Sequence, residues 1–422
     1  MDAFRIQGGA PLQGEVTVDG MKNAILPMMA AAILATEGEL VLENVPDLRD
    51  VRVMLRILET LGVRGGYDSA ARTLTLDARG DIGDTAPYEL VKQMRASFLV
   101  SGALLARLGH CRVSMPGGCA IGSRPVTDQM HAFQALGGDV RETQGYLEIV
   151  AKDLHGRLVT LDYPAVTGTE NIILAAVHAD GITVIENAAC DPEVVDFGEC
   201  LREMGADIRG PGTKRIEVAG VERLHGARHR VVPDRIDAAT FAISAAMTRG
   251  KVFLRDARPD HFEIVLTKLE DAGATILRRP DGVEVTGPDR LRAVNIRTLP
   301  YPAFPTDVQA PMMAAMSVAD GASLIWEQVY DNRFTQGPEL RRMGANITIA
   351  GDKAVVVGVP ELAGAPVMSS DIRAGGALVL AGLAARGETT VSRVYHIDRG
   401  YDHLERRLQR LGATIERFDE KI

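Results

Sequence analysis

Seven side chains in this 422-residue chain have types and positions suited to chemistry on an anionic substrate. Three are cations at the predicted starts of apolar helices, where the helix end already carries partial positive charge. A cation is favourable there when a phosphate or carboxylate bridges it to the helix end, although a solvated or salt-bridged cation is the alternative. Three are arginines in loops between a strand and the next helix, and arginine suits planar, bidentate recognition of such anions. The seventh is a cysteine. In chain order they are Lys22, Arg95, Cys119, Arg124, Arg333, Arg373 and Arg399.

Cys119 differs from the other cysteines because glycines surround it in PGGCAIG (116–122). These glycines predict an exposed backbone, where a packing role is poorly served, and the nearby Arg124 favours a thiolate. We therefore predict a chemical role for Cys119. Cys111, Cys190 and Cys200 are predicted to be small buried apolar residues.

Polar residues also stand at the predicted helix starts, and two interpretations remain open for them. Thr169, Asp237, Thr306 and Asp307 could be ordinary helix caps, because Ser, Thr, Asp and Asn accept hydrogen bonds from free N–H groups there. They could equally be ligand contacts.

One local pattern of about 70 residues recurs six times and must position these side chains. Each copy has a small-residue apolar helix, a short strand of alternating character, and a second helix that ends in an LGA-like turn. The first helices are apolar on nearly all sides, which predicts full burial. The alternating strands then form outer sheets. This predicts an inside-out α/β fold of βαβαββ-type repeats. The closing glycines are Gly62, Gly137, Gly205, Gly273, Gly344 and Gly412.

The chain ends indicate how the repeats are divided. The sixth copy stops after one strand, and FRIQGGAPLQGEVTVDG (4–20) matches the strands that it lacks. We expect one domain of residues 1–20 plus 233–422, and a second of residues 21–232 that carries the cysteine loop. Ligands are expected in a cleft between them.

Composition narrows the function. A net charge of −9 argues against general binding to nucleic acid or an acidic membrane. The four cysteines show no zinc spacing, which argues against a zinc site. The N-terminus lacks the features of a secretory signal and no apolar run reaches about 20 residues, so we expect a cytoplasmic protein.

Several motifs together resemble the enolpyruvyl transferase family, and within it the UDP-N-acetylglucosamine 1-carboxyvinyltransferases. They extend over the whole chain: GMKNA (20–24), QMRAS (93–97), PGGCAIGSRPV (116–126), FPTDVQ (304–309), NRF (332–334), DIRA (371–374) and YHIDRGY (395–401). The sister enzymes of aromatic biosynthesis act on shikimate 3-phosphate and have a cysteine-free NAGTAxRP loop. They are the nearest rival interpretation, followed by a non-catalytic UDP-sugar-binding paralogue.

The resemblance implies transfer of the enolpyruvyl group of phosphoenolpyruvate to the 3-hydroxyl of UDP-N-acetylglucosamine, with release of phosphate. It also implies that no metal or organic cofactor is required. This is the first committed step of peptidoglycan synthesis, and therefore of cell-wall formation, cell shape and division. The family's fold has two inside-out α/β domains of three repeats each. The oligomeric state, monomer or weak homo-oligomer, stays open.

By motif match, the resemblance also implies roles for individual residues. Cys119 would be the general acid and the site of the phosphoenolpyruvate or fosfomycin adduct, and Asp307 would be the base, with Lys22 as a further catalytic residue. The phosphoenolpyruvate contacts would be Lys22, Asn23, Arg124, Arg333, Arg373 and Arg399. The UDP-sugar contacts would be Asn23, Arg95, Arg124, Pro125, Val126, Thr127, Asp128, Thr167, Gly168, Asp307 and Val329.

Overall fold

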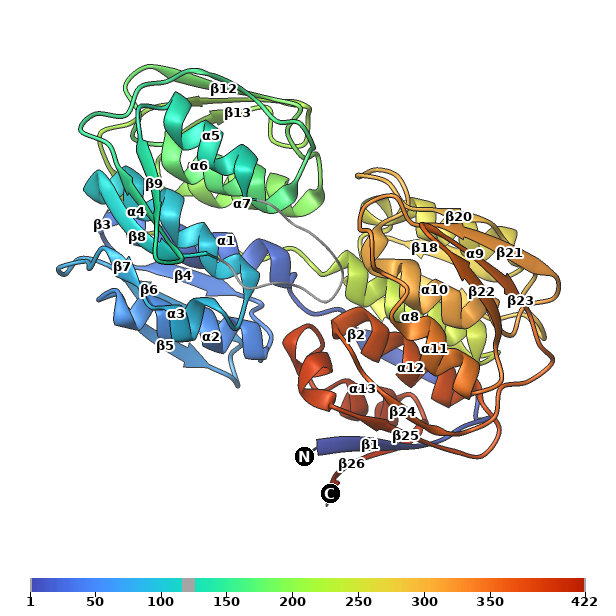
Figure 1. Ribbon diagram of the computed structural model, residues 1–422. Helices are drawn as coiled ribbons and strands as arrows, with labels where there is room; N and C mark the ends of the chain where they lie inside the picture. Colours follow the sequence, from blue (N-terminus) through green and yellow to red (C-terminus); the bar gives the residue numbers. More distant parts are fainter. Residues whose placement is uncertain (1, 116–125, 421–422) are drawn as a thin grey trace. The chain divides into compact units, whose positions relative to one another are not determined.

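The structure is a computed structural model and describes residues 2–115 and 126–420 (Figure 1). The described residues form two compact units, each with its own core. We call residues 20–115 and 126–232 the N-terminal unit, and residues 2–19 and 233–420 the C-terminal unit. The expected ligand cleft between domains stays a prediction.

Each unit has three apolar helices at its centre. Every residue of the helices at Arg235–Met247 and Gln309–Met316 is buried, as the small side chains on all their faces predict. The six central helices are α1 (Lys22–Ala31), α4 (Val100–Leu108), α6 (Val166–Ala176), α8 (Arg235–Met247), α10 (Gln309–Met316) and α12 (Ile372–Ala384). The predicted burial of these helices is confirmed.

The second helix of each repeat ends in the same way. Its closing glycine has a positive φ, from 92° at Gly412 to 109° at Gly137, a conformation that favours glycine. In the first repeat the Gly62 N–H donates to the Glu59 carbonyl and the Val63 N–H to the Leu58 carbonyl, a Schellman motif. The other five turns repeat these two bonds. The helices are α2 (Arg49–Thr60), α5 (Thr127–Ala135), α7 (Pro192–Glu203), α9 (Glu263–Asp271), α11 (Gln336–Arg342) and α13 (Leu404–Arg410).

Six four-stranded sheets among the described residues cover the central helices and share one strand order. A short parallel edge strand pairs with the strand that follows the central helix, and two antiparallel strands complete the sheet. In the N-terminal unit the orders are β16 (Arg228–Arg230), β4 (Leu40–Glu43), β6 (Thr73–Asp77), β5 (Arg64–Asp68); β7 (Thr85–Ala86), β8 (His110–Ser114), β10 (Tyr146–Val150), β9 (Asp139–Thr143); and β11 (Leu158–Thr160), β12 (Ile182–Glu186), β14 (Arg215–Ala219), β13 (Asp207–Arg209).

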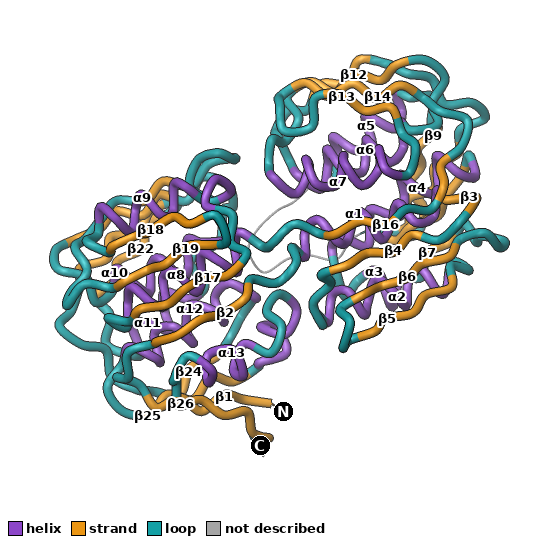
Figure 2. Tube along the Cα trace, turned by 180° about the vertical axis from the view of Figure 1, so that it is seen from behind, coloured by secondary structure: helices purple, strands orange, loops and turns teal. Residues whose placement is uncertain are grey.

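In the C-terminal unit the same order recurs, and Figure 2 shows these strands from behind. The sheets are β2 (Gln13–Thr17), β17 (Lys251–Arg255), β19 (Gly282–Thr286), β18 (Thr275–Arg279); β20 (Ile296–Arg297), β21 (Ala322–Trp326), β23 (Lys353–Val357), β22 (Asn346–Ala350); and β24 (Pro366–Met368), β25 (Glu388–Ser392), β1 (Asp2–Gln7), β26 (Thr414–Asp419).

The N-terminal strand β1 takes the place that the third strand of a repeat has elsewhere. It lies between β25 and β26, antiparallel to both, with Arg5 opposite Thr390 and Glu416. The inference that the N-terminus completes the sixth repeat is confirmed for this strand. The next strand, β2, pairs instead with β17 of the fourth repeat. This also fits the pattern, because every edge strand joins the sheet of another repeat in its unit.

The remaining elements are short. They include a two-stranded sheet and several turns that precede or follow the central helices: β3 (Ala35–Glu37), β15 (Leu224–His225), α3 (Tyr88–Val91), η1 (Ala32–Leu34), η2 (Arg95–Leu99), η3 (Pro259–His261), η4 (Thr306–Val308) and η5 (Val394–Arg399). Of the predicted helix starts, Lys22 and Arg373 do fall in the first turns of α1 and α12, whereas Arg95 and Thr306 begin short 3-10 helices before α4 and α10.

Candidate active site

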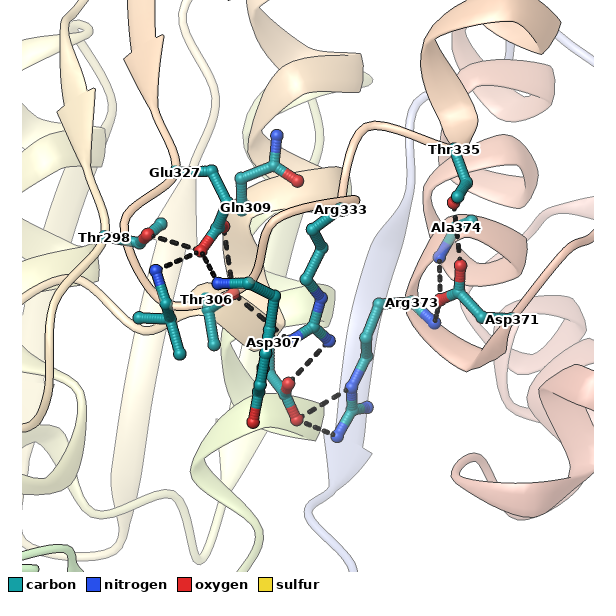
Figure 3. Close-up of polar contacts among 12 residues, drawn as sticks. Thr298, Thr306, Asp307, Gln309, Glu327, Arg333, Thr335, Asp371, Arg373 and Ala374 are labelled. Atoms are coloured by element: carbon teal, nitrogen blue, oxygen red, sulfur yellow. Dashed lines mark hydrogen bonds and ion pairs between the residues drawn. The ribbon is translucent and has the colours of Figure 1, made fainter. Parts of the chain in front are cut away.

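Asp307 lies between two arginines in the C-terminal unit (Figure 3). Arg333 Nη2 donates to Asp307 Oδ1 at 2.7 Å. Arg373 donates to Oδ2 through Nη2 at 2.9 Å and Nε at 3.1 Å. The two arginine side chains are only 6% and 5% exposed, whereas Asp307 is 25% exposed. The Asp307 side chain is therefore partly exposed, while both guanidiniums that hold it are buried.

Both arginines remain charged in spite of their burial. Burial disfavours a charged guanidinium, but the Asp307 carboxylate outweighs this, so that the pKa of Arg333 and that of Arg373 lie above the usual value. The Nη1 of Arg373 is buried and has no hydrogen-bond partner among the described residues. The other two nitrogens of the guanidinium, Nε and Nη2, both bond to Asp307.

Arg333 is itself held by a hydroxyl that leads to a buried acid. Its Nη1 donates to Thr306 Oγ1 at 3.1 Å, and Thr306 Oγ1 donates to Glu327 Oε2 at 2.9 Å. Glu327 is 2% exposed and follows β21 directly. Its Oε1 accepts from Thr298 Oγ1 at 2.8 Å and from the backbone N–H groups of Val329 and Tyr330 at 2.9 and 3.2 Å. Neither Glu327 nor Thr298 is among the residues predicted from the sequence.

Arg373 is positioned by the start of its helix. Asp371 caps α12 by accepting from the backbone N–H groups of Arg373 and Ala374, and Thr335 Oγ1 donates to its other oxygen. On the far side, the Arg373 guanidinium lies 5.5 Å from the ring centre of Tyr401. Burial raises the pKa of Tyr401, and the Arg373 charge opposes this rise.

A second ion-pair cluster lies at the start of α8. Arg407 donates to both oxygens of Asp237 at 2.9 and 2.7 Å and lies 2.9 Å from Asp19. Burial raises the pKa of Asp237 to about 6 against the lowering effect of Arg407. Tyr401 connects this cluster to Arg373, because its hydroxyl shares a 3.0 Å hydrogen bond with Thr240 on α8.

The predicted residues of the N-terminal unit lie on several elements. Lys22 is 8% exposed, and its Nζ lies 3.5 Å from Asp50 on α2, so the salt-bridged alternative holds for this cation in part. Asn23 follows it in the first turn of α1. Thr127 and Asp128 open α5 directly after Val126, and Thr167 and Gly168 are in the first turn of α6.

The remaining predicted residues lie on other short elements or outside the described residues. Arg399 ends η5 and Arg95 begins η2, and the backbone N–H of Val329 belongs to the Glu327 turn. Cys119, Arg124 and Pro125 lie outside the described residues, so their predicted roles stay predictions.

The helix-cap interpretation is wrong for all four residues to which it was applied. None of the four occupies the N-cap position, which belongs to Ala165 in α6, Asp234 in α8 and Pro305 in η4. Thr169 Oγ1 instead accepts from the Ala189 N–H at 3.0 Å. This hydrogen bond connects the loop before α7 to α6. The caps are provided by neighbouring residues, Asp234 for α8 and Asp371 for α12.

The prediction of a buried position is confirmed for Cys111 and Cys200 and needs correction for Cys190. Cys111 and Cys200 are 3% and 0% exposed, and burial raises the pKa of Cys111 to about 12 and that of Cys200 further. Cys190 is only half-buried, because it lies in the loop before α7, where its Sγ is 3.7 Å from the Ala188 carbonyl.

Each unit has a hollow at the C-terminal ends of its central helices, whereas the predicted site residues lie near the helix starts. One of about 510 Å³ includes Met247, Val318 and Ala384, at the C-terminal ends of α8, α10 and α12. One of about 730 Å³ in the N-terminal unit includes Leu108 and Ala179. Neither contains a predicted site residue, and in the first of them Arg290 donates to the Ala319 and Val318 oxygens.

Neither a metal site nor a membrane-spanning helix is found among the described residues. No group of three or more His, Cys, Asp or Glu side chains among them could hold a metal ion. No helix in the described ranges has the length and apolar character needed to cross a membrane.

Comparisons with known proteins extend over the whole chain. A family profile described as EPSP synthase (3-phosphoshikimate 1-carboxyvinyltransferase) matches residues 6–408. A protein of Caldanaerobacter subterraneus named UDP-N-acetylglucosamine 1-carboxyvinyltransferase 1 is 50% identical over 98% of this chain and 99% of its own length. Proteins of Dichelobacter nodosus and Myxococcus xanthus named UDP-N-acetylglucosamine 1-carboxyvinyltransferase are 49% and 50% identical over 100% and 99% of the chain, and over the same shares of their own lengths.

Solved structures agree on the fold. The enolpyruvyl transferase NikO from Streptomyces tendae is 26% identical, with a TM-score of 0.88 over 99% of this chain and 98% of its own. EPSP synthase from Acinetobacter baumannii is 20% identical, with a TM-score of 0.77 over 99% of this chain and 100% of its own. The fold is therefore that of the enolpyruvyl transferases, as the repeat pattern and motifs predicted. At about half identity over full length, the chain belongs to the UDP-N-acetylglucosamine 1-carboxyvinyltransferase (MurA) branch of the enolpyruvyl transferase family.

Proposed function

We propose that this chain transfers the enolpyruvyl group of phosphoenolpyruvate to the 3-hydroxyl of UDP-N-acetylglucosamine and releases phosphate. The observation that supports this most directly is the Asp307 carboxylate held by Arg333 and Arg373. It combines an exposed proton acceptor with buried donors for an anion. Relatives about 50% identical have this activity in their names, whereas the EPSP synthase comparison at 20% identity bears on the fold alone.

The donor, phosphoenolpyruvate, is an anion with a phosphate and a carboxylate. Arg333 and Arg373 would recognise its carboxylate through guanidinium N–H groups. Lys22, Arg124 and Arg399 would hold the phosphate, and Asn23 would lie beside both substrates. These charges would also stabilise the tetrahedral phosphate ketal.

The UDP-sugar would contact both the loop after Cys119 and the helix starts. Arg95, Arg124, Pro125, Val126, Thr127, Asp128, Thr167, Gly168 and Val329 are its proposed contacts, with Asn23 and Asp307. In the described part of this set, Thr127 and Thr167 lie in first turns of helices, where N–H groups favour an anionic diphosphate.

The reaction needs one base and one acid. Asp307 would take the proton of the sugar 3-hydroxyl while that oxygen bonds to C2 of phosphoenolpyruvate. Cys119 would give its proton to C3, which becomes a methyl group. Elimination then removes a proton from C3 and expels phosphate, and the enol ether is restored on the sugar. Lys22 would assist by holding the departing phosphate. We place this step in peptidoglycan synthesis in the cytoplasm.

Substitution of Cys119 tests the acid. Asp can offer a transferable proton and Ser, with its far higher pKa, cannot do so efficiently. Neither provides a soft nucleophilic sulfur. Cys119→Asp should therefore keep substantial phosphate release and resist fosfomycin, and Cys119→Ser should be nearly inactive. Cys111→Ser is the matched control and should remain sensitive to fosfomycin.

The assay is phosphate release with phosphoenolpyruvate, with and without UDP-N-acetylglucosamine. Release that requires the UDP-sugar supports the function. A fosfomycin adduct located by mass spectrometry on another residue, or full activity of Cys119→Ser, would contradict the assignment.

A further inference from the structure

Glu327 occupies a position that the repeats otherwise use for local structure. It is the first residue after β21, and the equivalent residue follows β4, β12, β17 and β25 in four other repeats. Sheet registers fix the equivalence, because Trp326 lies opposite Arg297 as Glu43 lies opposite Arg230 and Glu186 opposite Thr160. The four equivalents are Asn44, Asn187, Asp256 and Arg393.

These four residues have a left-handed backbone, with φ between 57° and 64°. Two of them also tie the turn to the neighbouring edge strand. Asn44 Nδ2 donates to the Val231 carbonyl at 3.1 Å, and Asn187 Nδ2 donates to the Leu161 carbonyl at 2.9 Å. An asparagine suits this role because it tolerates the left-handed region and bonds locally. What the four repeats share is the left-handed backbone, and in two of them a short amide side chain also bonds to the edge strand.

Glu327 departs from this pattern in both respects. Its φ is not positive, and its longer side chain accepts four hydrogen bonds instead of donating one. One bond still reaches the edge-strand side, from Thr298. The bond to Thr306 has no counterpart at Asn44 or Asn187. None of the four donors is a cation, so burial of this carboxylate costs free energy that no ion pair offsets.

The added bond leads directly to the proposed base. Thr306 donates to Glu327 and so must present its oxygen lone pairs to Arg333 Nη1. Arg333 then meets Asp307 through Nη2. Since both Nη atoms of Arg333 are engaged, the plane of the guanidinium is defined. Figure 3 shows the four side chains in this sequence of contacts.

We propose that Glu327 and Thr306 are positioning residues for the reaction: they orient Arg333 against Asp307 and so determine how readily this carboxylate stays ionised to accept the sugar proton. This inference rests on the proposed function of Asp307. It explains why a buried acid without a cation replaces the asparagine of the scaffold in the one repeat that carries the proposed base.

Thr306→Val is the sharpest test, because it removes the hydroxyl and keeps the shape of the side chain. A looser Arg333 stabilises the Asp307 carboxylate less, which raises the pKa of that group. We expect kcat to fall about tenfold to a hundredfold and the acidic limb of the kcat/KM profile to move to higher pH. Thr306→Ser keeps the hydroxyl and should restore both.

Glu327→Gln makes a second, milder test. Its amide oxygen can still accept from Thr298, Val329 and Tyr330, but its NH2 group would donate to Thr306 and leave the Thr306 hydrogen without an acceptor. The acidic limb should move in the same direction as in Thr306→Val, with a loss of kcat of about threefold to tenfold.

The matched control is Thr248→Val. Thr248 is a buried hydroxyl of the same unit at the C-terminal end of α8, where it donates to the Ser244 carbonyl. Its loss should leave the pH profile unchanged. Trp326, the single tryptophan of the chain, directly precedes Glu327, so an unchanged fluorescence spectrum shows that the strand end remains folded.

A merely structural role predicts a lower melting temperature with an unmoved acidic limb, and that result would overturn the inference. The proposed function fails separately, if Asp307→Asn retains turnover. An inactive Asp307→Asn together with a fully active, unshifted Thr306→Val refutes the positioning role alone.

Discussion

The two units treat a carboxyl group at the start of a central helix in opposite ways. In the C-terminal unit, Asp307 meets two guanidiniums and Asp237 meets one. In the N-terminal unit, Glu170 on α6 is 1% exposed, and its Oε1 has no hydrogen-bond partner among the described residues. Burial raises the pKa of Glu170 well above its usual value, and the Glu193 and Asp191 carboxylates add to this.

The difference shows that the repeat fixes a location and leaves the charge state to its neighbours. A carboxyl group that faces a guanidinium is favoured as an anion and can accept a proton, whereas burial beside two further carboxylates favours the neutral form of Glu170. The polar contacts of the N-terminal unit are accordingly neutral around α6: Asn171 Nδ2 donates to Gln129 Oε1 at 2.7 Å, and the Gly102 N–H donates to Asn171 Oδ1 at 2.9 Å.

The largest effect is expected where the anion is used. Asp307→Asn removes the proton acceptor and keeps the size of the side chain, so turnover should fall by about 10²–10⁴. Calorimetry should still detect binding of both substrates. If the variant instead lost UDP-sugar binding, Asp307 would have a structural role.

The next largest effect, on stability, is expected at Arg407, the cation that pairs with Asp237. Arg407→Met leaves Asp237 and Asp19 buried without their guanidinium, and breaking a buried ion pair on one side costs about 3–5 kcal/mol. Urea unfolding should show this loss of unfolding free energy. The double variant Arg407→Met/Asp237→Leu should regain part of it, and no regain would indicate that packing of the Arg407 stem dominates.

A histidine supplies the comparable ion pair in the N-terminal unit and makes it sensitive to pH. His229 is 7% exposed and lies 3.0 Å from Asp196 and 2.9 Å from Glu203, both on α7. Burial lowers the pKa of His229, but the hydrogen bond to Asp196 and the two carboxylates outweigh this, and the pKa rises.

Because the folded pKa is raised, the stabilisation is complete below about pH 6.5 and is lost as pH rises through the folded value. His229→Gln should lower the unfolding free energy by about 1.5–3 kcal/mol at pH 6, the range for hydrogen bonds to charged groups, and by less at pH 9. Urea unfolding of both proteins from pH 6 to 9 measures this. A difference that is the same at every pH would mean that His229 is not charged in the folded protein.

The smallest effect is expected at Glu170, which lies outside the proposed substrate contacts. An amide resembles a protonated carboxyl group in size and charge, so Glu170→Gln should change the unfolding free energy by less than about 0.5 kcal/mol and leave turnover unchanged. A large stabilisation at pH 7 would show that Glu170 is ionised in the parent and would erase the contrast with Asp237.

Local sequence patterns predicted much of this molecule. Apolar helices, alternating strands and LGA turns depend on residues close in sequence, and they led to the repeats and to the place of β1. Arg333 and Arg373 stood out because cations and loop arginines break the repeat. Thr306, Glu327 and Thr298 could not be assigned, because their hydrogen bonds join residues 21 to 29 positions apart. The role of Asp237 could not be predicted for the same reason. Its partner Arg407 is 170 positions away in the sequence, so that a helix cap was an equally good interpretation.

The pairing of β1 with β26 has a consequence for the newly made chain. Roughly 400 residues separate Phe4 and Ile6 from their partners Arg417 and Ile415, and a ribosome needs on the order of tens of seconds to add them. Throughout that interval β1 is a short apolar strand without its neighbours, a segment that chaperones bind and that aggregates when exposed. Its outward Arg5 carries a charge that discourages pairing with other chains. Maturation of the C-terminal unit therefore waits until β26 has been synthesised, whereas the three sheets of the N-terminal unit contain no strand beyond Arg230 and can close earlier.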